Sequence, residues 1–531
     1  MSNETHDASS EAIEASLAPI AGPRQPQRLK TGAIGIFAVL FMALANAAPI
    51  TAMTGNVPIA IGYGNGVGAP AGYLVATVVL TIFTVGFVSM AKHITTTGTF
   101  LGFTSHGLGQ VWGMGSGLLA TLAYVVFEGS LVGIFASFAR SFVLQLNGPD
   151  ISWLWYALLC VAVVAVLGYY DVEISGRVLG IFLITEVLML GAFDLWTVFH
   201  TGPDGFVPSA LNPANAFKAA PTSPDGAIVG SAGIGLFFAF WSWIGYETTA
   251  VYGEESREPR RIIPRATLIA VVLLGFAYTL TSWMAVVANG VDKSIAVSRG
   301  NNPFDLYLAP VQSYFGTFGH DLYQLLTVTG SFACALAFHN AASRYIYALG
   351  REGVSDTLSR TIGATHGKHK SPHIASLLQS LITLLIVLGF YFFVKPSDPT
   401  QDVAYLYLYG LLSILGTLAI LIVIAVCSIA VVVYFHVGNN HPETKNWWNT
   451  FLAPIIGFLG ISYVIYLLLQ NINFAAGAAA DSLVFKWTPW IVLAVYVFGL
   501  AFALILRSTN RAKYDLIGRT VLEEAHERVD A

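Results

Sequence analysis

The chain has 531 residues, of which 55% are hydrophobic and only 11% are charged, and its formal net charge is −4. A soluble protein of this length needs more charge, and the net negative charge gives no reason to expect nucleic acid as a partner. The composition therefore indicates an all-α integral membrane protein, because about 20 consecutive apolar residues form a helix that crosses a bilayer.

Twelve apolar runs of roughly this length are predicted transmembrane helices. The run 403–435 carries no charge over 33 residues. It is interpreted as one tilted helix, because two spans and a turn need about 40 residues or more. The runs, in chain order, are 33–60, 70–91, 108–141, 153–170, 179–201, 228–252, 267–289, 321–348, 374–394, 403–435, 450–470 and 488–507.

The distribution of basic residues predicts the orientation. An even number of spans puts both termini on one side of the membrane, and 20 of the 26 lysines and arginines then share that side. The positive-inside rule makes this side cytoplasmic, so we expect a multi-pass protein of the plasma (cell inner) membrane. Residues 1–31 are expected to be a disordered cytoplasmic tail and 508–531 a cytoplasmic C-terminal tail. The six basic residues expected outside are Arg140, Lys218, Lys293, Arg299, Lys395 and Lys486.

The first run contains a stretch that is poorly suited to a plain helix, ANAAPITAMTGNVP. Pro49 removes a backbone donor and clashes with the preceding turn, and Gly55 and Pro58 follow it. Two interpretations remain open: a proline kink packed on its neighbours, or an unwound segment whose backbone groups face a ligand. The second makes a set of residues here candidates for substrate binding, namely Asn46, Ala48, Thr51, Ala52, Thr54 and Gly55.

The sixth run contains a matching weak point in FAFWSWIGYETT. Gly245 costs about 1 kcal/mol relative to alanine in a helix and permits a break. Spans 1 and 6 occupy corresponding places in two five-helix halves, and paired interrupted helices point to a transporter site at the bilayer midplane. Helix N-termini there suit a carboxylate and exposed carbonyls suit an ammonium group, so an amino acid would match both.

Three segments carry a family resemblance: WIGYETTAVYGEESREPRRIIPRA, ISGRVLGIFLITEVLML, and NAASRYIYALGREGVSDTLSRTIGATHGKHKSPHIA. In that order they resemble the sixth span, the fifth span, and the eighth span with its following loop, of the amino acid–polyamine–organocation (APC) superfamily, over about residues 30–510. The resemblance implies a LeuT-type five-plus-five inverted repeat with helices 1 and 6 interrupted. It implies first repeat 32–201, extracellular connection 202–227, second repeat 228–435, and helices 11 and 12 at 436–507.

One departure concerns the substrate. Many family members have a G-S-G-type stretch in the first span, where this chain has Thr51–Gly55. The substrate's size and identity therefore cannot be carried over from the better-known members.

Three acids lie within predicted spans, where a charge costs a few kcal/mol or more and is a functional hypothesis by default. Glu186 falls, by resemblance, where some proton-coupled members place a lysine that substitutes for bound sodium. It either exchanges a proton, helps to bind Na⁺, or only bonds a backbone carbonyl. By resemblance Glu128 lies near the pocket for the substrate's side chain, as a counter-ion or as a structural hydrogen-bond partner. Glu247 either titrates or braces helices 1 and 6.

Trp241 matches a family aromatic that covers the substrate, and Phe240 lies beside it. His339 is interpreted as a helix-packing residue, with proton relay as the alternative. Arginines at the cytoplasmic helix ends, Arg344 and Arg351 among them, are expected to anchor inner loops and to pair with Glu254, Glu255 and Glu258.

The functional prediction is a secondary active transporter, not an enzyme, that imports an amino acid or related amine by alternating access. The partners expected are the substrate, membrane lipid and a coupling ion, H⁺ or possibly Na⁺. No cofactor or metal is expected, because Cys160, Cys334 and Cys427 lie far apart in apolar runs. The alternatives are an exchanger, a sodium symporter, a channel or a transporter-fold receptor, and the sequence gives no oligomeric state.

In the predicted mechanism, the substrate carboxylate meets freed N–H groups around Thr51–Gly55. The amine meets carbonyls near Asn46–Ala48 and at the break Phe240–Gly245, and Trp241 closes over the substrate. A proton or cation at Glu186 then biases the two states.

Overall fold

The structure is a computed structural model that describes residues 29–170, 172–224, 226, 229–396, 401–476, 479 and 482–519. Within those ranges the chain is helical and forms no β-strand, apart from one isolated bridge between Ile34 and Ser256. The all-α prediction is therefore confirmed for the described part of the chain. Predictions for the tail residues 1–28 and 520–531 lie outside it.

The α-helices are α2 (Ile36–Ala47), α3 (Pro49–Ile59), α4 (Ala69–Ala91), α5 (Thr99–Leu108), α6 (Gln110–Gln145), α7 (Trp153–Tyr169), α8 (Val172–Phe199), α9 (Ala232–Trp243), α10 (Pro259–Asn289), α11 (Val291–Ser298), α12 (Asp305–Arg351), α13 (Asp356–Arg360), α14 (His373–Phe393), α15 (Gly410–Val432), α16 (Ala453–Ala476), α17 (Leu483–Thr509) and α18 (Arg511–Tyr514). Tighter or wider helical turns form η1 (Ala60–Asn65), η2 (Gly66–Gly68), η3 (Pro208–Leu211), η4 (Pro213–Phe217), η5 (Tyr246–Glu255), η6 (Val403–Tyr409), η7 (Val433–Val437) and η8 (Trp448–Leu452).

Nine helices among the described residues are long and apolar enough to cross a membrane. This number is smaller than twelve for identifiable reasons. The first two predicted spans follow each other in a single stretch, Ile36–Ala91, that counts once despite a break inside it. The fourth is the shorter helix Trp153–Tyr169, and the sixth is broken after α9. The span 403–435 is a single stretch of 35 residues, Val403–Val437, as predicted. Each of the twelve predicted runs contains helix, while the twelve-span arrangement itself remains a prediction.

Large apolar side chains project outward from the peripheral helices. Phe199 on α8 is 71% exposed and Phe393 on α14 is 85% exposed, and α16 and α17 carry similar residues. Exposed apolar surface on this scale is unfavourable in water but suits lipid. The inner helices α6, α12 and α15 are mostly buried. The protein is accordingly a multi-pass membrane protein.

The first span breaks at one residue. Helix α2 ends at Ala47, and Ala48 adopts the left-handed conformation with φ 43° and ψ 73°. Pro49 then opens α3, where its missing N–H is harmless because a first-turn N–H has no helical partner. A residue before proline is also disfavoured in the right-handed helical region, so Pro49 itself directs the break to Ala48.

The sixth span breaks over two residues. Helix α9 ends at Trp243, Ile244 is outside the helical region with ψ 127°, and Gly245 has φ 116°. The chain continues as η5, a 3₁₀ helix of ten residues. The prediction that both spans are interrupted, near Pro49 and at Gly245, is confirmed.

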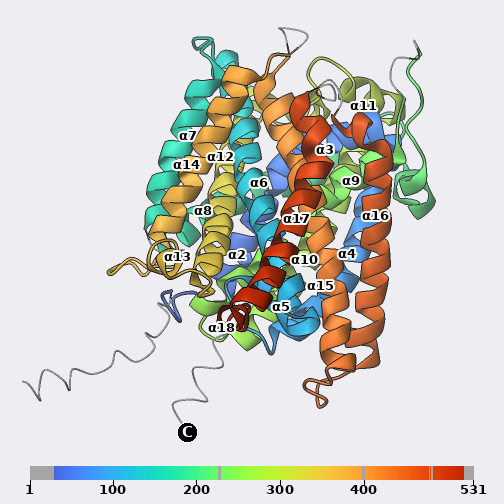
Figure 1. The fold of residues 1–531 in the computed structure, drawn as a ribbon. Helices are drawn as coiled ribbons and strands as arrows, with labels where there is room; N and C mark the ends of the chain where they lie inside the picture. Colours follow the sequence, from blue (N-terminus) through green and yellow to red (C-terminus); the bar gives the residue numbers. More distant parts are fainter. Residues whose placement is uncertain are drawn as a thin grey trace, which may run out of the picture.

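The two breaks touch. A Cβ atom on Gly245 would lie 2.5 Å from Cβ of Asn46 and 3.0 Å from its carbonyl carbon, so only glycine permits this approach. The outer halves of the same spans also meet, because a Cβ on Gly64 would lie 2.5 Å from Cα of Gly235. In Figure 1, α3 and α9 occupy the upper half of the bundle and α2 the lower half, so the breaks lie near mid-height.

Candidate functional site

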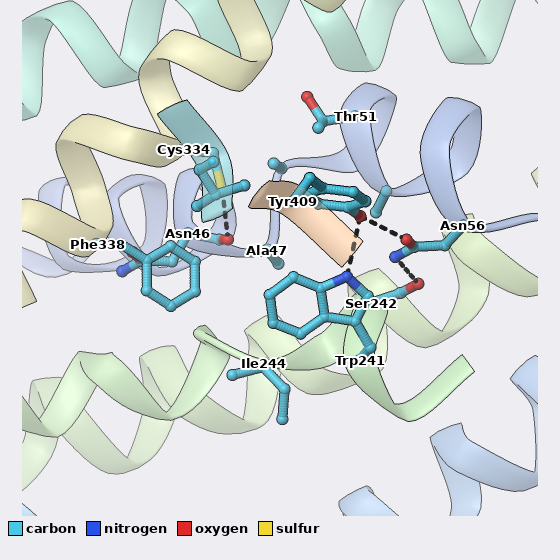
Figure 2. Close-up of a pocket in the computed structure, with 13 residues that line it drawn as sticks. Asn46, Ala47, Thr51, Asn56, Trp241, Ser242, Ile244, Cys334, Phe338 and Tyr409 are labelled. Atoms are coloured by element: carbon cyan, nitrogen blue, oxygen red, sulfur yellow. Dashed lines mark hydrogen bonds between the residues drawn. The ribbon is translucent and has the colours of Figure 1, made fainter. Parts of the chain in front are cut away.

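A small cavity lies at the two breaks (Figure 2). The space inside it that a water-sized sphere can reach is about 20 Å³, well below the roughly 300–1,000 Å³ of small-ligand pockets, so the cavity must widen before it can hold a ligand of that size. Its walls come from α2, α3, α6, the end of α9, α12 and η6. The residues that line it are Asn46, Ala47, Ala48, Thr51, Ala52, Asn56, Leu131, Trp241, Ser242, Ile244, Cys334, Phe338 and Tyr409.

A chain of hydrogen bonds crosses one side of the cavity (Figure 2). Trp241 Nε1 donates to the Tyr409 hydroxyl at 3.0 Å, and that hydroxyl donates to Asn56 Oδ1 at 2.7 Å. Asn56 Nδ2 in turn donates to Ser242 Oγ at 2.9 Å. These hydrogen bonds link the two interrupted spans to η6. A displacement of any of the three segments would therefore also displace the indole of Trp241, which lines the cavity.

Among the described residues, two side chains that line the cavity carry a buried polar atom without a hydrogen-bond partner: Asn46 Oδ1 and Thr51 Oγ1. The amide nitrogen of Asn46, by contrast, donates to Thr248 Oγ1 at 2.7 Å and so fixes the side chain. Buried polar atoms are almost always paired, and an unpaired one costs about 1–3 kcal/mol. One acceptor and one hydroxyl thus point to a polar ligand between the breaks.

The backbone at the first break is only partly as predicted. Residues Thr51–Gly55 are not unwound but form the first turns of α3, so most of their N–H groups are used within the helix. Pro49 shortens the unwound region to Ala48 alone. The carbonyls before the break are also engaged, since Asn46 O accepts from the Cys334 thiol at 3.1 Å and Ala47 O accepts from the Tyr278 hydroxyl at 2.6 Å. The prediction that the backbone N–H groups around Thr51–Gly55 are free to bind a ligand is therefore wrong for most of these residues.

Five of the predicted substrate-binding residues line the cavity: Asn46, Ala48, Thr51, Ala52 and Trp241. The structure brings them together from positions nearly 200 residues apart. Trp241 lies across the cavity with its ring 4.6 Å from that of Phe127, between centroids. Their role in binding stays a prediction.

Four other predicted residues lie close to the breaks but outside the cavity lining. Thr54 bonds the Tyr323 hydroxyl at 2.9 Å, and Gly55 O accepts from the Tyr405 hydroxyl at 3.2 Å. Phe240 is fully buried in α9, and Gly245 forms the contact with Asn46. Their places favour packing of the breaks over contact with a ligand.

Glu128 does not face the cavity, contrary to the expectation drawn from the family. Both its carboxylate oxygens lie 3.1 Å from His339 Nδ1, and one accepts from Gln379 Nε2 at 2.5 Å. The residue is 1% exposed and joins α6 to α12 and α14. The helix turns its side chain away because Phe127, one position earlier, takes the inward direction.

Glu186 and Glu247 each lie at one break. Glu186 on α8 is 2% exposed, and its Oε2 accepts from the backbone N–H of Ile50, in the first turn of α3, at 3.4 Å. Glu247 is 1% exposed and accepts from the Tyr124 hydroxyl at 2.7 Å and from Gly245 N–H at 2.9 Å. Neither lines the cavity, and the contacts of Glu247 favour the bracing alternative.

Sequence reasoning missed several residues of the cavity wall. Asn56 and Ser242 lie on the two interrupted spans and directly follow the predicted residues Gly55 and Trp241, so a polar side chain so near a break was a usable signal. Tyr409 was harder to find, although Tyr405 and Tyr409 are four residues apart on one face of an apolar run. Leu131, Ile244, Cys334 and Phe338 give no signal in the sequence beyond their apolar character.

Predicted ion pairs close one end of the molecule. Arg344 donates to Glu255 at 2.7 and 2.9 Å, and Arg351 donates to Glu254, with all four residues buried. Glu254 also accepts from Thr97 N–H at 3.3 Å. These pairs join η5 to the end of α12, and buried pairs of this kind are costly to break.

No cluster of three or more metal-ligating side chains occurs in the described ranges. The cysteines at 160, 334 and 427 are all free and buried. The cavity is thus built from hydroxyls, amides, an indole and apolar groups.

Known proteins with similar sequences are amino acid permeases and transporters. A family model described as amino acid permease matches residues 34–500. A branched-chain amino acid permease of Bacillus subtilis is 20% identical over 451 residues, covering 82% of this chain and 86% of the relative. The corresponding permease of Lactococcus lactis is 25% identical over 251 residues, covering 44% and 47%.

An uncharacterized transporter of Mycobacterium bovis is 24% identical over 262 residues, covering 44% of this chain and 53% of the relative. The chain thus spans about half the length of that relative, and nearly all of the Bacillus subtilis permease. The family model covers most of the residues that build the cavity and both breaks. The chain belongs to the amino acid permease family.

Proposed function

We propose that this protein is a secondary active transporter that imports a neutral amino acid across the plasma membrane by alternating access, coupled to protons. The observation that carries the proposal is the small cavity between two helix breaks, with Asn46 Oδ1 and Thr51 Oγ1 buried and unpaired in its wall. A zwitterion supplies what each lacks, since its ammonium donates to Asn46 Oδ1 and its carboxylate accepts from the Thr51 hydroxyl.

Helix ends reinforce this orientation. The N-terminus of α3 begins at Pro49, next to the cavity, and its positive dipole end favours a carboxylate. The C-termini of α2 and α9 carry the negative dipole ends and favour the ammonium. Half-helix ends of this kind hold charged substrate groups at the midplane of transporters.

The remaining wall favours a neutral side chain on the substrate. Leu131, Ile244 and Phe338 are apolar, and no acidic or basic side chain is among the residues that line the cavity. Burying a charged substrate side chain without a partner is costly. The substrate is therefore a neutral amino acid, in keeping with the names of the Bacillus subtilis and Lactococcus lactis relatives, which are branched-chain amino acid permeases. An amine without a carboxylate would leave Thr51 and the α3 terminus unmatched.

Coupling is assigned to Glu186. Its carboxyl group lies at the first turn of α3, where the substrate carboxylate is expected, and Ile50 N–H at 3.4 Å is a long contact. A carboxylate so weakly held can exchange a proton, and protonation removes its repulsion of an anionic substrate group. Binding of proton and substrate would then favour each other. Exchange without net proton flux, or Na⁺ in place of H⁺, are the alternative couplings at this position.

Movement is proposed between two bodies taken from the family resemblance. One contains α2, α3, α4, α9, η5 and α10, and the other contains α6, α7, α12 and α14. The five-plus-five repeat of residues 32–201 and 228–435 underlies them, and both termini are cytoplasmic. Arg344–Glu255 and Arg351–Glu254 join η5 to α12, which belong to different bodies, so these ion pairs must separate when the cytoplasmic side opens.

Uptake by proteoliposomes tests the proposal. A panel of neutral, cationic and acidic amino acids, polyamines and amino alcohols is offered under imposed proton or sodium gradients. We expect saturable, uphill uptake of neutral amino acids with a proton gradient. Flux that never exceeds equilibrium would indicate a channel, and tight binding without flux would indicate a receptor.

A matched pair of variants links uptake to the cavity. Thr51→Val removes the unpaired hydroxyl and should raise KM about tenfold, since one hydrogen bond to a charged group contributes roughly 1.5–3 kcal/mol. Thr417→Val removes another buried, unpaired hydroxyl that lies on α15 outside the cavity lining, and should leave KM unchanged. Equal effects of the two variants would contradict this site.

A further inference from the structure

Directly behind the cavity wall lies a buried polar cluster that the transport mechanism above does not use. It comprises Glu128 on α6, His339 on α12, and Gln379 and Ser376 on α14, each 1% exposed or less. His339 Nδ1 lies 3.1 Å from both Glu128 oxygens, and Gln379 Nε2 donates to Glu128 at 2.5 Å. His339 Nε2 lies 2.8 Å from Ser376 Oγ. The cluster therefore joins three helices through one carboxyl group.

The cluster has little freedom to move. The ring of His339 is held from both sides, by Glu128 at Nδ1 and by Ser376 at Nε2, and these two contacts set its orientation. Helix α7 closes the site, since a Cβ on Gly168 would lie 2.5 Å from His339 Nε2. A buried polar cluster of this kind persists only while its partners stay in position, because losing one partner leaves the others buried without a hydrogen bond.

Of the residues that precede Glu128 and His339, Phe338 lines the cavity, and Phe127 packs behind it against both Phe338 and Trp241. Phe127 and Phe338 lie with ring centroids 5.1 Å apart, and Phe127 lies 4.6 Å from the ring of Trp241. Phe338 lines the cavity, as Figure 2 shows. Successive residues on a helix point about 100° apart, since a turn holds 3.6 residues. On both helices, then, the polar residue faces the cluster while its neighbour faces the aromatic side chains at the cavity.

We propose that Glu128, His339 and Gln379 are positioning residues that hold Phe127 against Trp241, and Phe338 against Phe127, and so set the affinity for the substrate. The proposal rests on the transport function proposed above. A slip or rotation of α6 relative to α12 displaces both phenyl rings together, and small displacements in a binding site have large effects on affinity. The cluster acts from outside the cavity, without contact with the substrate.

The test is a double-mutant cycle on KM for radiolabelled leucine in proteoliposomes. Glu128→Gln replaces one acceptor oxygen with an amide that faces the Gln379 amide, and should raise KM about tenfold, which corresponds to about 1.4 kcal/mol. Phe338→Leu should raise KM directly. If the cluster acts through the wall, Glu128→Gln adds little once Phe338 is already truncated. If the two effects multiply, the proposal is wrong.

A compensating swap separates positioning from charge. Glu128→Gln combined with Gln379→Glu restores a complementary acceptor and donor across α6 and α14, and should return KM to within about twofold of wild type. If Glu128 were instead a counter-ion for the substrate, the swap would not restore KM. The variant transporter would then also discriminate less between cationic and neutral substrates than the wild type does. Should Glu128→Gln alone fail to fold, the swap decides, since a tenfold higher KM there contradicts positioning.

Gln145→Leu is the matched control. Gln145 on α6 donates to Asp321 on α12 at 2.5 Å, so this contact joins the same two helices near the far end of α6. The variant should leave KM unchanged. An equal rise in KM would show that any loosening of α6 and α12 suffices. Absence of amino acid uptake by the wild type would contradict the proposed function itself, whereas normal uptake with an unchanged KM in Glu128→Gln would contradict only this inference.

Discussion

The two helix breaks solve the same problem with different chemistry. The first turns at a single residue, Ala48, because Pro49 both excludes the right-handed conformation before it and starts a new helix. The second needs Ile244 and Gly245, and it continues as the 3₁₀ helix η5. A proline thus makes a sharp break with normal helix on both sides, while a glycine makes a wider one that requires support from side chains.

The acids at the two breaks differ in the hydrogen bonds that they accept. Glu247 accepts two good hydrogen bonds, one from its own segment at Gly245 and one from Tyr124 on α6. Glu186 comes from another helix and has one long contact with Ile50 N–H. A carboxyl group that is fully bonded braces a structure, whereas one that is weakly bonded is free to exchange a proton or an ion. The comparison assigns support to Glu247 and coupling to Glu186.

The largest expected effect comes from Gly245→Ala. Alanine is strained at φ 116°, and its Cβ would lie 2.5 Å from Asn46 Cβ, so the two breaks would have to separate. We expect uptake to fall by about a hundredfold or more, as displacement of binding groups commonly causes. Uptake is measured at equal amounts of folded, monodisperse protein. Gly389→Ala is the control, since α14 leaves open space around it and alanine favours helix. Normal uptake by Gly245→Ala would show that the contact between the breaks is not needed.

Glu186→Gln should abolish uphill accumulation while leaving counterflow of substrate down its own gradient. The amide keeps the shape of the side chain but cannot exchange a proton, so the accumulation ratio should fall to about one if coupling is removed. Asp194→Asn, on the same helix α8 and bonded to Thr281 at 2.7 Å, should keep proton-driven accumulation. If Glu186→Gln accumulates substrate with unchanged pH dependence, the coupling role is wrong.

Glu247→Gln should lower stability more than it changes coupling. The amide retains one acceptor oxygen where the carboxylate had two, so we expect a loss of about 1–3 kcal/mol. Thermal unfolding in detergent measures it, and Tyr124→Phe, which removes the same bond from the other side, should give a smaller loss. An unchanged unfolding temperature together with lost accumulation would instead make Glu247 a titrating group.

Ala48→Gly should have the smallest effect and the opposite sign. Glycine relieves the left-handed strain at φ 43°, roughly 1–2 kcal/mol, but loses about 0.5–1 kcal/mol of backbone entropy. A net gain in stability of up to about 1 kcal/mol is expected. Ala43→Gly, inside α2, should destabilise by about 1 kcal/mol. A loss of stability in Ala48→Gly would mean that Ala48 is not strained.

Much of this could be predicted from the sequence because membrane helices must satisfy their own backbone groups. Long apolar runs, Pro49 and Gly245 therefore located helices and breaks directly. The directions of side chains could not be predicted in the same way. Glu128 was expected to face the substrate, yet Phe127 takes that direction and Glu128 bonds His339 and Gln379. Tyr409 lies 168 residues after Trp241 in the sequence, and only the packing of η6 against α9 brings the two side chains together.

By itself, the sequence determined the class of protein, the helical segments, and that spans 1 and 6 break near Pro49 and Gly245, since these depend on local hydrophobicity and backbone chemistry. The tertiary structure alone decided which atoms meet between the breaks. It placed Asn56, Tyr409 and Ser242 in one hydrogen-bond chain with Trp241, and it left Asn46 Oδ1 and Thr51 Oγ1 without partners. The physical reason is that the rotation and packing of each helix depend on contacts with segments hundreds of residues away.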